Sequence, residues 1–155
     1  MPSDSDAIAA LIYAYAERLD EGDLEGVARL FAHATLRNDG RPEVFHGSDA
    51  VLTVYRLILT LYDGKPCTKH VTTNLVIAVD EQSGTASARS YYTVLQARPE
   101  LPLQIIIAGH YHDRFARIED AWRFTDRLIF VDLIGDLRFH LQFNPFPQSP
   151  AEQAR

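Results

Sequence analysis

Two polar side chains, His70 and Asn74, lie within the segment Cys67 to Asp80, whose other residues are typical of a β-strand. An imidazole gains and loses a proton near neutral pH, so His70 is a candidate general base. Four residues of strand place both side chains on one face, about 13 Å apart, where they could line one pocket. Both residues could instead have a purely structural role. His70 could be a core histidine whose ring nitrogens are hydrogen-bonded to neighbours, and Asn74 could stabilise a β-bulge; the sequence leaves these alternatives open.

Asp20 is the acidic residue that could pair with His70. It lies in the last turn of the first predicted helix, where a negative charge opposes the helix dipole. A solvated carboxylate is one interpretation, because Asp20 falls outside the apolar stripe of that helix. If the helix end instead tilts toward the pocket, the carboxylate accepts a hydrogen bond from His70 and makes the other ring nitrogen more basic. The pair would then be suited to proton abstraction.

His110 and His112 project from one face of a predicted strand, and such a pair can chelate a metal. No glutamate or cysteine recurs on that face, so we expect no metal and interpret the two histidines as an outward-facing pair at a subunit contact. Residues of the other parity then point inward, and Asp113 could form an ion pair with Arg127 of the neighbouring strand.

Other chemistries have little support in the sequence. No GxSxG elbow is present and Cys67 has no evident base beside it, so nucleophilic catalysis is not expected. The glycine spacing that would cradle a nucleotide is missing, and we expect no cofactor. The net charge of −6, with dispersed Lys and Arg, argues against a nucleic-acid partner.

The 155 residues predict one domain over residues 1–146 and a flexible C-terminal tail over 147–155. Phe143 and Phe146 are expected to fold back onto the domain. We expect neither a signal peptide nor a membrane span, because no apolar run reaches about 20 residues. With a single cysteine no internal disulfide can form, which fits a cytoplasmic location.

Apolar residues recur at three- and four-residue spacing in three segments before residue 66, which predicts three amphipathic helices. The dipeptide Asp39-Gly40 predicts a small hairpin between the second and third. The expected cap and stop residues are Ser3 or Ser5 and Gly22 for the first helix, Asp23 for the second, and Ser48, Gly64 and Pro66 for the third.

The rest of the chain predicts four long antiparallel strands, so the fold class is α+β. Strands of about 12 residues must twist, and the sheet is expected to curve into a half-barrel or cone around the three helices. Because helices can fill only the concave face and the other face is also apolar, we expect a homo-oligomer, a dimer or trimer. The strands are expected near residues 67 to 80, 85 to 98, 103 to 118 and 121 to 134.

Several motifs, together with these elements, resemble the SnoaL-like family of the nuclear transport factor two-like superfamily, an α+β cone. The resemblance covers nearly the whole chain. The motifs that carry it are "YAYAERLDEGDLEGVARLF", His70-x3-Asn74, Gly109-x-Tyr111-x-Asp113-x-Phe115, "WRF" at Trp122 to Phe124, and Asp132 followed by Gly135-Asp136-Leu137 and His140.

Within the superfamily the sequence looks like the branch of scytalone dehydratase, bile-acid dehydratase and hexachlorocyclohexane dehydrochlorinase, which share a His-Asp dyad. The resemblance implies that His70 and Asp20 form this dyad and that Tyr15 is a catalytic pocket tyrosine. The implied chemistry is removal of a proton from a hydrophobic, cyclic small molecule, leading to elimination, isomerisation or cyclisation. The residues expected to bind substrate are Tyr55, Asn74, Tyr92, Tyr111 and Trp122.

The second long strand departs from the pattern of these lyases. They often carry an acidic or histidine group there to help the leaving group, whereas this strand offers Ser90, Tyr91, Tyr92 and Gln96. A tyrosine can donate a proton or polarise a carbonyl in their place.

The strand motifs also resemble the small (beta) subunit of aromatic-ring-hydroxylating dioxygenases, which is trimeric and is not the redox centre. A binding module without catalysis is a further alternative. A catalytic cone needs an open pocket with Asp20 and His70 within hydrogen-bond reach, whereas a scaffold subunit can fill that space with side chains.

Overall fold

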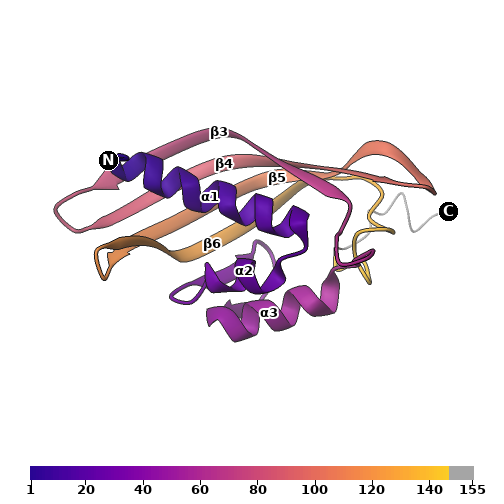
Figure 1. Cartoon of the computed structure of the whole chain (residues 1–155), viewed down its shortest axis with the longest axis horizontal. Coiled ribbons are helices and arrows are strands. Elements are labelled where there is room, and N and C mark those ends of the chain that lie inside the picture. Colours follow the sequence, from indigo (N-terminus) through magenta and orange to yellow (C-terminus); the bar gives the residue numbers. More distant parts are fainter. Residues whose placement is uncertain (147–155) are drawn as a thin grey trace.

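The computed structural model describes residues 1–146, and the tail predicted over 147–155 lies outside this range. Three helices lie on one side of a curved six-stranded sheet (Figure 1), which confirms the predicted α+β fold class. The elements are α1 (Asp4–Glu21), α2 (Leu24–Arg29), β1 (Thr35–Asn38), β2 (Val44–His46), α3 (Gly47–Ile58), β3 (Thr68–Asp80), β4 (Thr85–Arg98), β5 (Leu101–Ile118) and β6 (Ala121–Ile134).

Helix α1 has defined signals at both ends. Ser3 caps its start, because the Ser3 hydroxyl accepts from the Asp6 backbone N–H while the Asp6 carboxylate accepts from the Ser3 N–H. Gly22 ends it in the left-handed region, at a φ of 76°. A Cβ at Gly22 would lie 1.8 Å from the carbonyl oxygen of Gly64, so only glycine allows this close approach. The contact holds the end of α1 beside the segment that leads into β3.

Helix α3 differs from its prediction at both ends. Its N-cap is His46 rather than Ser48, and no side chain bonds to the free N–H groups there. The helix ends at Ile58, because Leu59 adopts an extended backbone and bridges to Leu141 in the C-terminal segment. The apolar periodicity continued past this point, but the tertiary pairing of Leu59 ends the helix.

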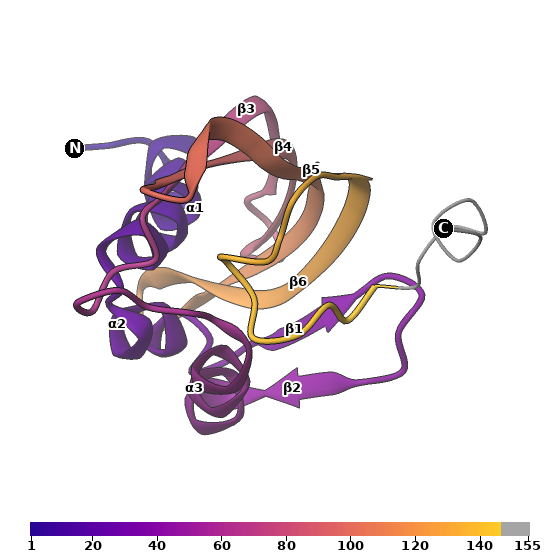
Figure 2. The same cartoon turned by 90° about the vertical axis from the view of Figure 1, so that its right-hand side faces the viewer.

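The strand order in the sheet is β2-β1-β6-β5-β4-β3. The four long strands pair antiparallel as predicted, while the short β1 pairs parallel with β6. The sheet bends around the helices, and residues 135–146 return across its open end past β1 and α3 (Figure 2).

A bulge in β3 changes which side chains face the helices. Register shifts between Thr73 and Val76, because three steps along β3 oppose two along β4, and Asn74 takes a φ of 53°. His70 therefore faces inward before the bulge, whereas Leu75 packs against the core after it. The prediction of one constant face from His70 through Asn74 was wrong, because one inserted residue reverses the alternation.

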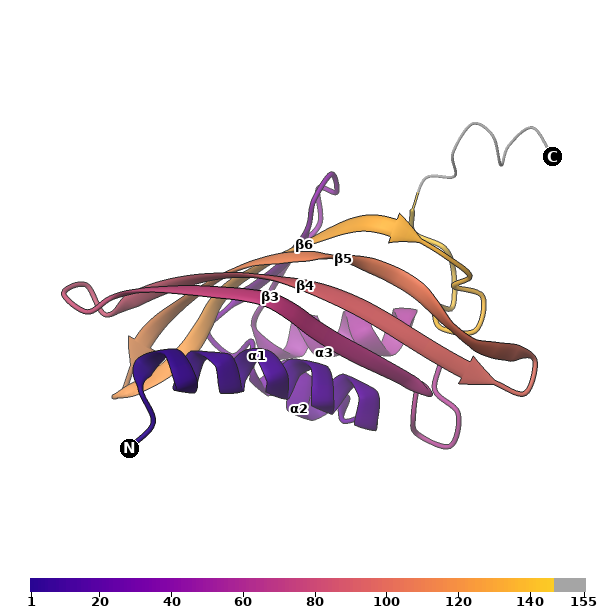
Figure 3. The ribbon, with the colours of Figure 1, turned by 90° about the horizontal axis from the view of Figure 1, so that it is seen from above.

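The convex face of the sheet carries no helix within residues 1–146 (Figure 3). Several large apolar side chains on the sheet are at least partly open to solvent. Their burial between subunits would be favourable, so a homo-oligomer stays a prediction. Among the described residues, no helix is long and apolar enough to cross a membrane. The most exposed of these apolar side chains are Val76, Tyr91, Leu103, Ile105 and Leu133.

Candidate active site

Asp20 and His70 are in direct contact where α1 ends against β3. The Asp20 Oδ1 atom lies 2.6 Å from His70 Nδ1, and Oδ2 accepts from the His70 backbone N–H at 2.8 Å. The Thr68 hydroxyl donates to Oδ1 at 2.8 Å. The carboxylate thus has three partners from the polar start of β3, which explains why Asp20 lies outside the apolar stripe of α1 without being solvated.

Burial and hydrogen bonding act in opposite directions on Asp20. Burial alone would raise the pKa of its carboxyl, but the bonds from His70 and Thr68 outweigh it and lower that pKa. Asp20 is therefore ionised at neutral pH, and it fixes the proton of neutral His70 on Nδ1. The Nε2 atom of His70 is left as a free acceptor.

A cavity of about 650 Å³ opens between the concave face of the sheet and the helices. Its wall is mainly apolar, contributed by strands β4, β5 and β6, by α3 and by the C-terminal segment. Such a cavity suits a hydrophobic small molecule with a few polar anchoring points. The predicted site residues that line it are Tyr15, Tyr55, His70, Tyr92 and Tyr111.

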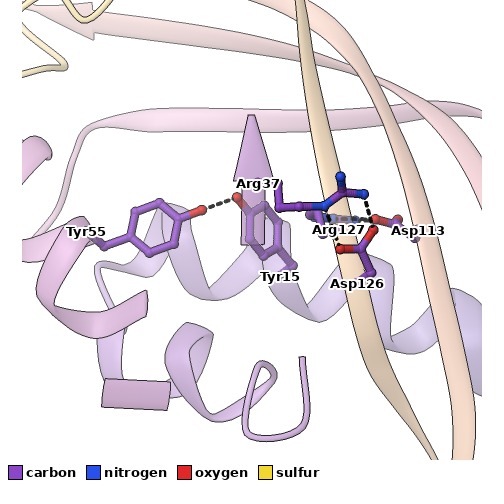
Figure 4. A network of polar contacts seen from close by, with 6 residues as sticks. All are labelled: Tyr15, Arg37, Tyr55, Asp113, Asp126 and Arg127. Carbon is purple, nitrogen blue, oxygen red and sulfur yellow. Dashed lines mark hydrogen bonds and ion pairs between the residues drawn. The ribbon is translucent and has the colours of Figure 1, made fainter. Parts of the chain in front are cut away.

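The tyrosines are held over a buried ion pair. The predicted pairing of Asp113 with Arg127 is confirmed, with two bonds of 2.8 Å between side chains that have no exposed surface. The guanidinium carbon of Arg127 lies 4.2 Å from the ring centre of Tyr15 and 3.8 Å from that of Tyr111. The Tyr15 hydroxyl in turn contacts the Tyr55 hydroxyl (Figure 4).

Burial raises the pKa of Tyr15, Tyr55 and Tyr111, so all three phenols stay protonated at neutral pH. Tyr15 and Tyr55 share one hydrogen bond, and one hydroxyl of the pair keeps a proton to donate to a bound molecule. This part of the wall can therefore bind a carbonyl oxygen.

Asn74 and Trp122 do not line the cavity, so the prediction that they belong to its wall was wrong. Asn74 lies exposed at the β3 bulge, where it lines a separate depression on the outer side of the sheet. Trp122 is buried, but its Nε1 donates to Asp4 at 2.9 Å near the start of α1. The alternation of side chains along a strand does not show where an extra residue is inserted, which is why Asn74 was misplaced. It also does not show how far along the sheet a residue such as Trp122 lies from the cavity.

The outward orientation predicted for His110 and His112 is confirmed. Both contribute to the same outer depression as Asn74. The His110 Nδ1 atom lies 2.7 Å from Asp132 Oδ2, and its ring stacks on Phe130 at a centroid distance of 4.3 Å. The subunit contact expected there stays a prediction.

His140 lines the cavity although the sequence assigned it no role. Its side chain is buried and its ring centre lies 6.5 Å from that of His70. It belongs to the segment after β6, which forms no helix or long strand that would fix its orientation. The alternation of Leu137, Phe139 and Leu141 around it was the only local signal, and it does not indicate a site. Phe143 and Phe146 also contribute to the cavity wall, as their predicted fold-back requires.

A long curved sheet wrapped around three helices places the chain among α+β proteins with a cystatin-like fold. Within this class, the model of the SnoaL-like domain matches residues 2–128, and the chain belongs to this family. No curated protein matches the sequence.

Solved structures share the fold. A variant of Rv3472, a function unknown protein from Mycobacterium tuberculosis, is 26% identical, with a TM-score of 0.67 over 83% of this chain and 71% of that one. A candidate scytalone dehydratase from Novosphingobium aromaticivorans is 21% identical, with a TM-score of 0.66 over 84% and 85%. The beta subunit of a candidate aromatic-ring-hydroxylating dioxygenase from the same organism is 22% identical, with a TM-score of 0.67 over 86% and 93%.

Proposed function

We propose that the protein is a cofactor-independent lyase or isomerase that removes a proton from a hydrophobic, cyclic small molecule, with His70 as general base. The observation that carries the proposal is the 2.6 Å contact between His70 Nδ1 and Asp20 at the wall of an open apolar cavity. Membership of the SnoaL-like family and the likeness to a candidate scytalone dehydratase support the same chemistry.

The roles follow from the contacts. Asp20 holds the imidazole in one orientation and stabilises the imidazolium that forms when Nε2 takes a proton. Tyr15, with Tyr55, donates to the substrate oxygen on which negative charge develops.

Scaffolding is the alternative, as a beta subunit-like protein or a binding module without catalysis. The likeness to a dioxygenase beta subunit and the exposed apolar side chains on the sheet favour it. The open cavity and the ionised Asp20 beside His70 favour catalysis, because a scaffold has no need of either. A homo-oligomer is compatible with both functions.

Proton exchange in a simple cyclic ketone tests the proposal and does not require the natural substrate. The probe is 3-phenylcyclohexanone in D2O, and NMR follows the loss of its α protons. Wild-type protein should accelerate the exchange, and His70→Ala should remove at least about a hundredfold of that acceleration. His33→Ala is the matched control, because His33 is exposed and lies away from the cavity.

Full activity of His70→Ala, or no acceleration by wild-type protein, would contradict the proposal. Circular dichroism of each variant should match that of the wild type, so that a loss of exchange reports on chemistry and not on folding.

A further inference from the structure

We propose that His140 is a second catalytic residue, which donates a hydrogen bond to an oxygen leaving group on the carbon next to the one that His70 deprotonates. The inference rests on the proposed function and narrows its substrate class to hydrophobic cyclic ketones with a hydroxyl β to the carbonyl. The reaction would then be a dehydration.

The position of His140 is fixed by the backbone on both sides. Its carbonyl accepts from the Thr60 N–H at 2.9 Å, and its own N–H donates to the Leu137 carbonyl at 3.1 Å. The Gln142 N–H donates to the Ile58 carbonyl at 2.8 Å, which ties the same segment to the end of α3. His140 is therefore held rigidly in the cavity wall, 7% exposed, with its ring at 60° to that of His70.

One ring nitrogen of His140 is buried without a hydrogen-bond partner. Nδ1 is fully buried and has no hydrogen-bond partner among the described residues, although buried polar atoms in native proteins nearly always have one. A buried N–H without an acceptor is rarer than a buried acceptor without a donor, so the proton belongs on Nε2. Nε2 makes no hydrogen bond to a described residue and is not among the buried atoms that lack a partner, and the side chain lines the cavity, so this N–H is placed to face a bound molecule.

His140 stays uncharged while His70 works. Burial, followed by the repulsion from His70, lowers the pKa of His140 to about 4, and the attraction of Asp20 offsets only part of this. The two imidazoles therefore present opposite functions to the cavity while the His70 ring is neutral. His70 offers a bare nitrogen that accepts a proton, and His140 offers an N–H that donates a hydrogen bond.

The dehydration is balanced with these two groups. His70 Nε2 takes the proton from the α carbon, and the electron pair of that C–H bond forms the double bond to the β carbon while the C–O bond breaks. The departing hydroxide takes the proton from the His70 imidazolium and leaves as water, which returns His70 to its neutral form. His140 keeps its own proton and stabilises the negative charge on the departing oxygen.

Two probe molecules allow the departure of the leaving group to be measured separately from proton abstraction. Elimination of water from 3-hydroxy-5-phenylcyclohexanone gives 5-phenylcyclohex-2-enone, which ultraviolet absorbance detects, while 3-phenylcyclohexanone has no leaving group and reports α-proton exchange only. His140→Phe should lower the ratio of the elimination rate to the exchange rate by about tenfold to a hundredfold. His140→Gln keeps an N–H donor and should recover most of the elimination rate, and His70→Ala should lose both reactions.

An equal loss of both reactions in His140→Phe, or an unchanged elimination rate, would overturn the role of His140 and leave His70 as the base. Wild-type protein that catalyses exchange but not elimination would overturn it too, whereas wild-type protein that catalyses neither overturns the proposed function along with it. If His140→Phe does not fold, nitrogen NMR of the wild type decides: a cationic ring or an Nδ1–H ring for His140 at neutral pH contradicts the inference.

Discussion

Each face of the sheet carries a histidine whose Nδ1 contacts a carboxylate, and the two pairs have nearly the same geometry. The contact is 2.6 Å for Asp20 with His70 on the inner face and 2.7 Å for Asp132 with His110 on the outer face. The histidine and carboxylate side chains are 9% and 11% exposed in the inner pair, but 27% and 50% exposed in the outer pair. Contact length therefore does not identify a site, whereas burial beside a cavity does, because water screens the outer pair.

The surroundings of the two pairs differ as much as their exposure. Asp20 also accepts from the His70 backbone N–H and from Thr68, so the inner pair belongs to a fixed network. On the outer face, the His110 ring stacks on Phe130, and the depression beside it is lined largely by polar side chains such as Thr73, Arg89 and His112. The inner pair is organised for chemistry, and the outer pair suits a polar contact at the surface.

The largest loss of stability is expected when the buried ion pair on the inner face of the sheet is broken. Arg127→Met leaves Asp113 buried without its partner and should lower the free energy of unfolding by about 3–5 kcal/mol, measured by urea denaturation. The control is Arg37→Met, because the Arg37–Asp126 pair shown in Figure 4 is partly exposed and contributes about 0–1 kcal/mol. Similar losses in the two variants would show that burial does not distinguish these pairs.

Matched carboxylate changes test the two His–Asp pairs against each other. Asp20→Asn should slow α-proton exchange in 3-phenylcyclohexanone by about a hundredfold, since the amide neither fixes the productive tautomer nor stabilises the imidazolium. Asp132→Asn should change the rate by less than about twofold. Equal rates in the two variants would remove the functional distinction between the faces.

Acid denaturation gives a smaller effect with a defined sign. The folded-state pKa of Asp20 lies below its ordinary value, so the stabilisation is complete above the unfolded-state pKa of about 3.9 and is lost as the pH falls through the folded-state pKa. Urea denaturation between neutral pH and about pH 3 should show a steeper loss of stability for wild type than for Asp20→Asn. Parallel curves for the two proteins would mean that Asp20 gains nothing from its partners.

The smallest effect is expected at Asn74, on the outer face. Its φ of 53° is left-handed, so Asn74→Gly should change the free energy of unfolding by less than about 0.5 kcal/mol, while Asn74→Val should cost about 1 kcal/mol or more. Thermal unfolding measures both, and α-proton exchange should stay at the wild-type rate. A large loss of exchange in Asn74→Gly would show that Asn74 does take part in the site.

Sequence reasoning succeeded where periodicity or residue chemistry decides the structure. The three helices, the long strands and the Asp113–Arg127 pair follow from patterns that extend over several residues. The approach of Asp20 to His70 was left open by the residues alone and was expected from the family resemblance. Asn74 was misplaced because one inserted residue in β3 reverses the faces, and no local pattern marks that insertion. His140 was missed because its segment is irregular and its position depends on backbone bonds to the end of α3.

The most direct measurement of the role of His70 is rescue of His70→Gly by free imidazole in the α-proton exchange assay. We predict a variant with little exchange activity, and a saturable gain of at least about tenfold when imidazole occupies the vacated space beside Asp20. The same addition to His70→Gly combined with Asp20→Asn should give a much smaller gain. Exchange that persists at the wild-type rate in His70→Gly without imidazole would contradict the assignment of His70 as the general base.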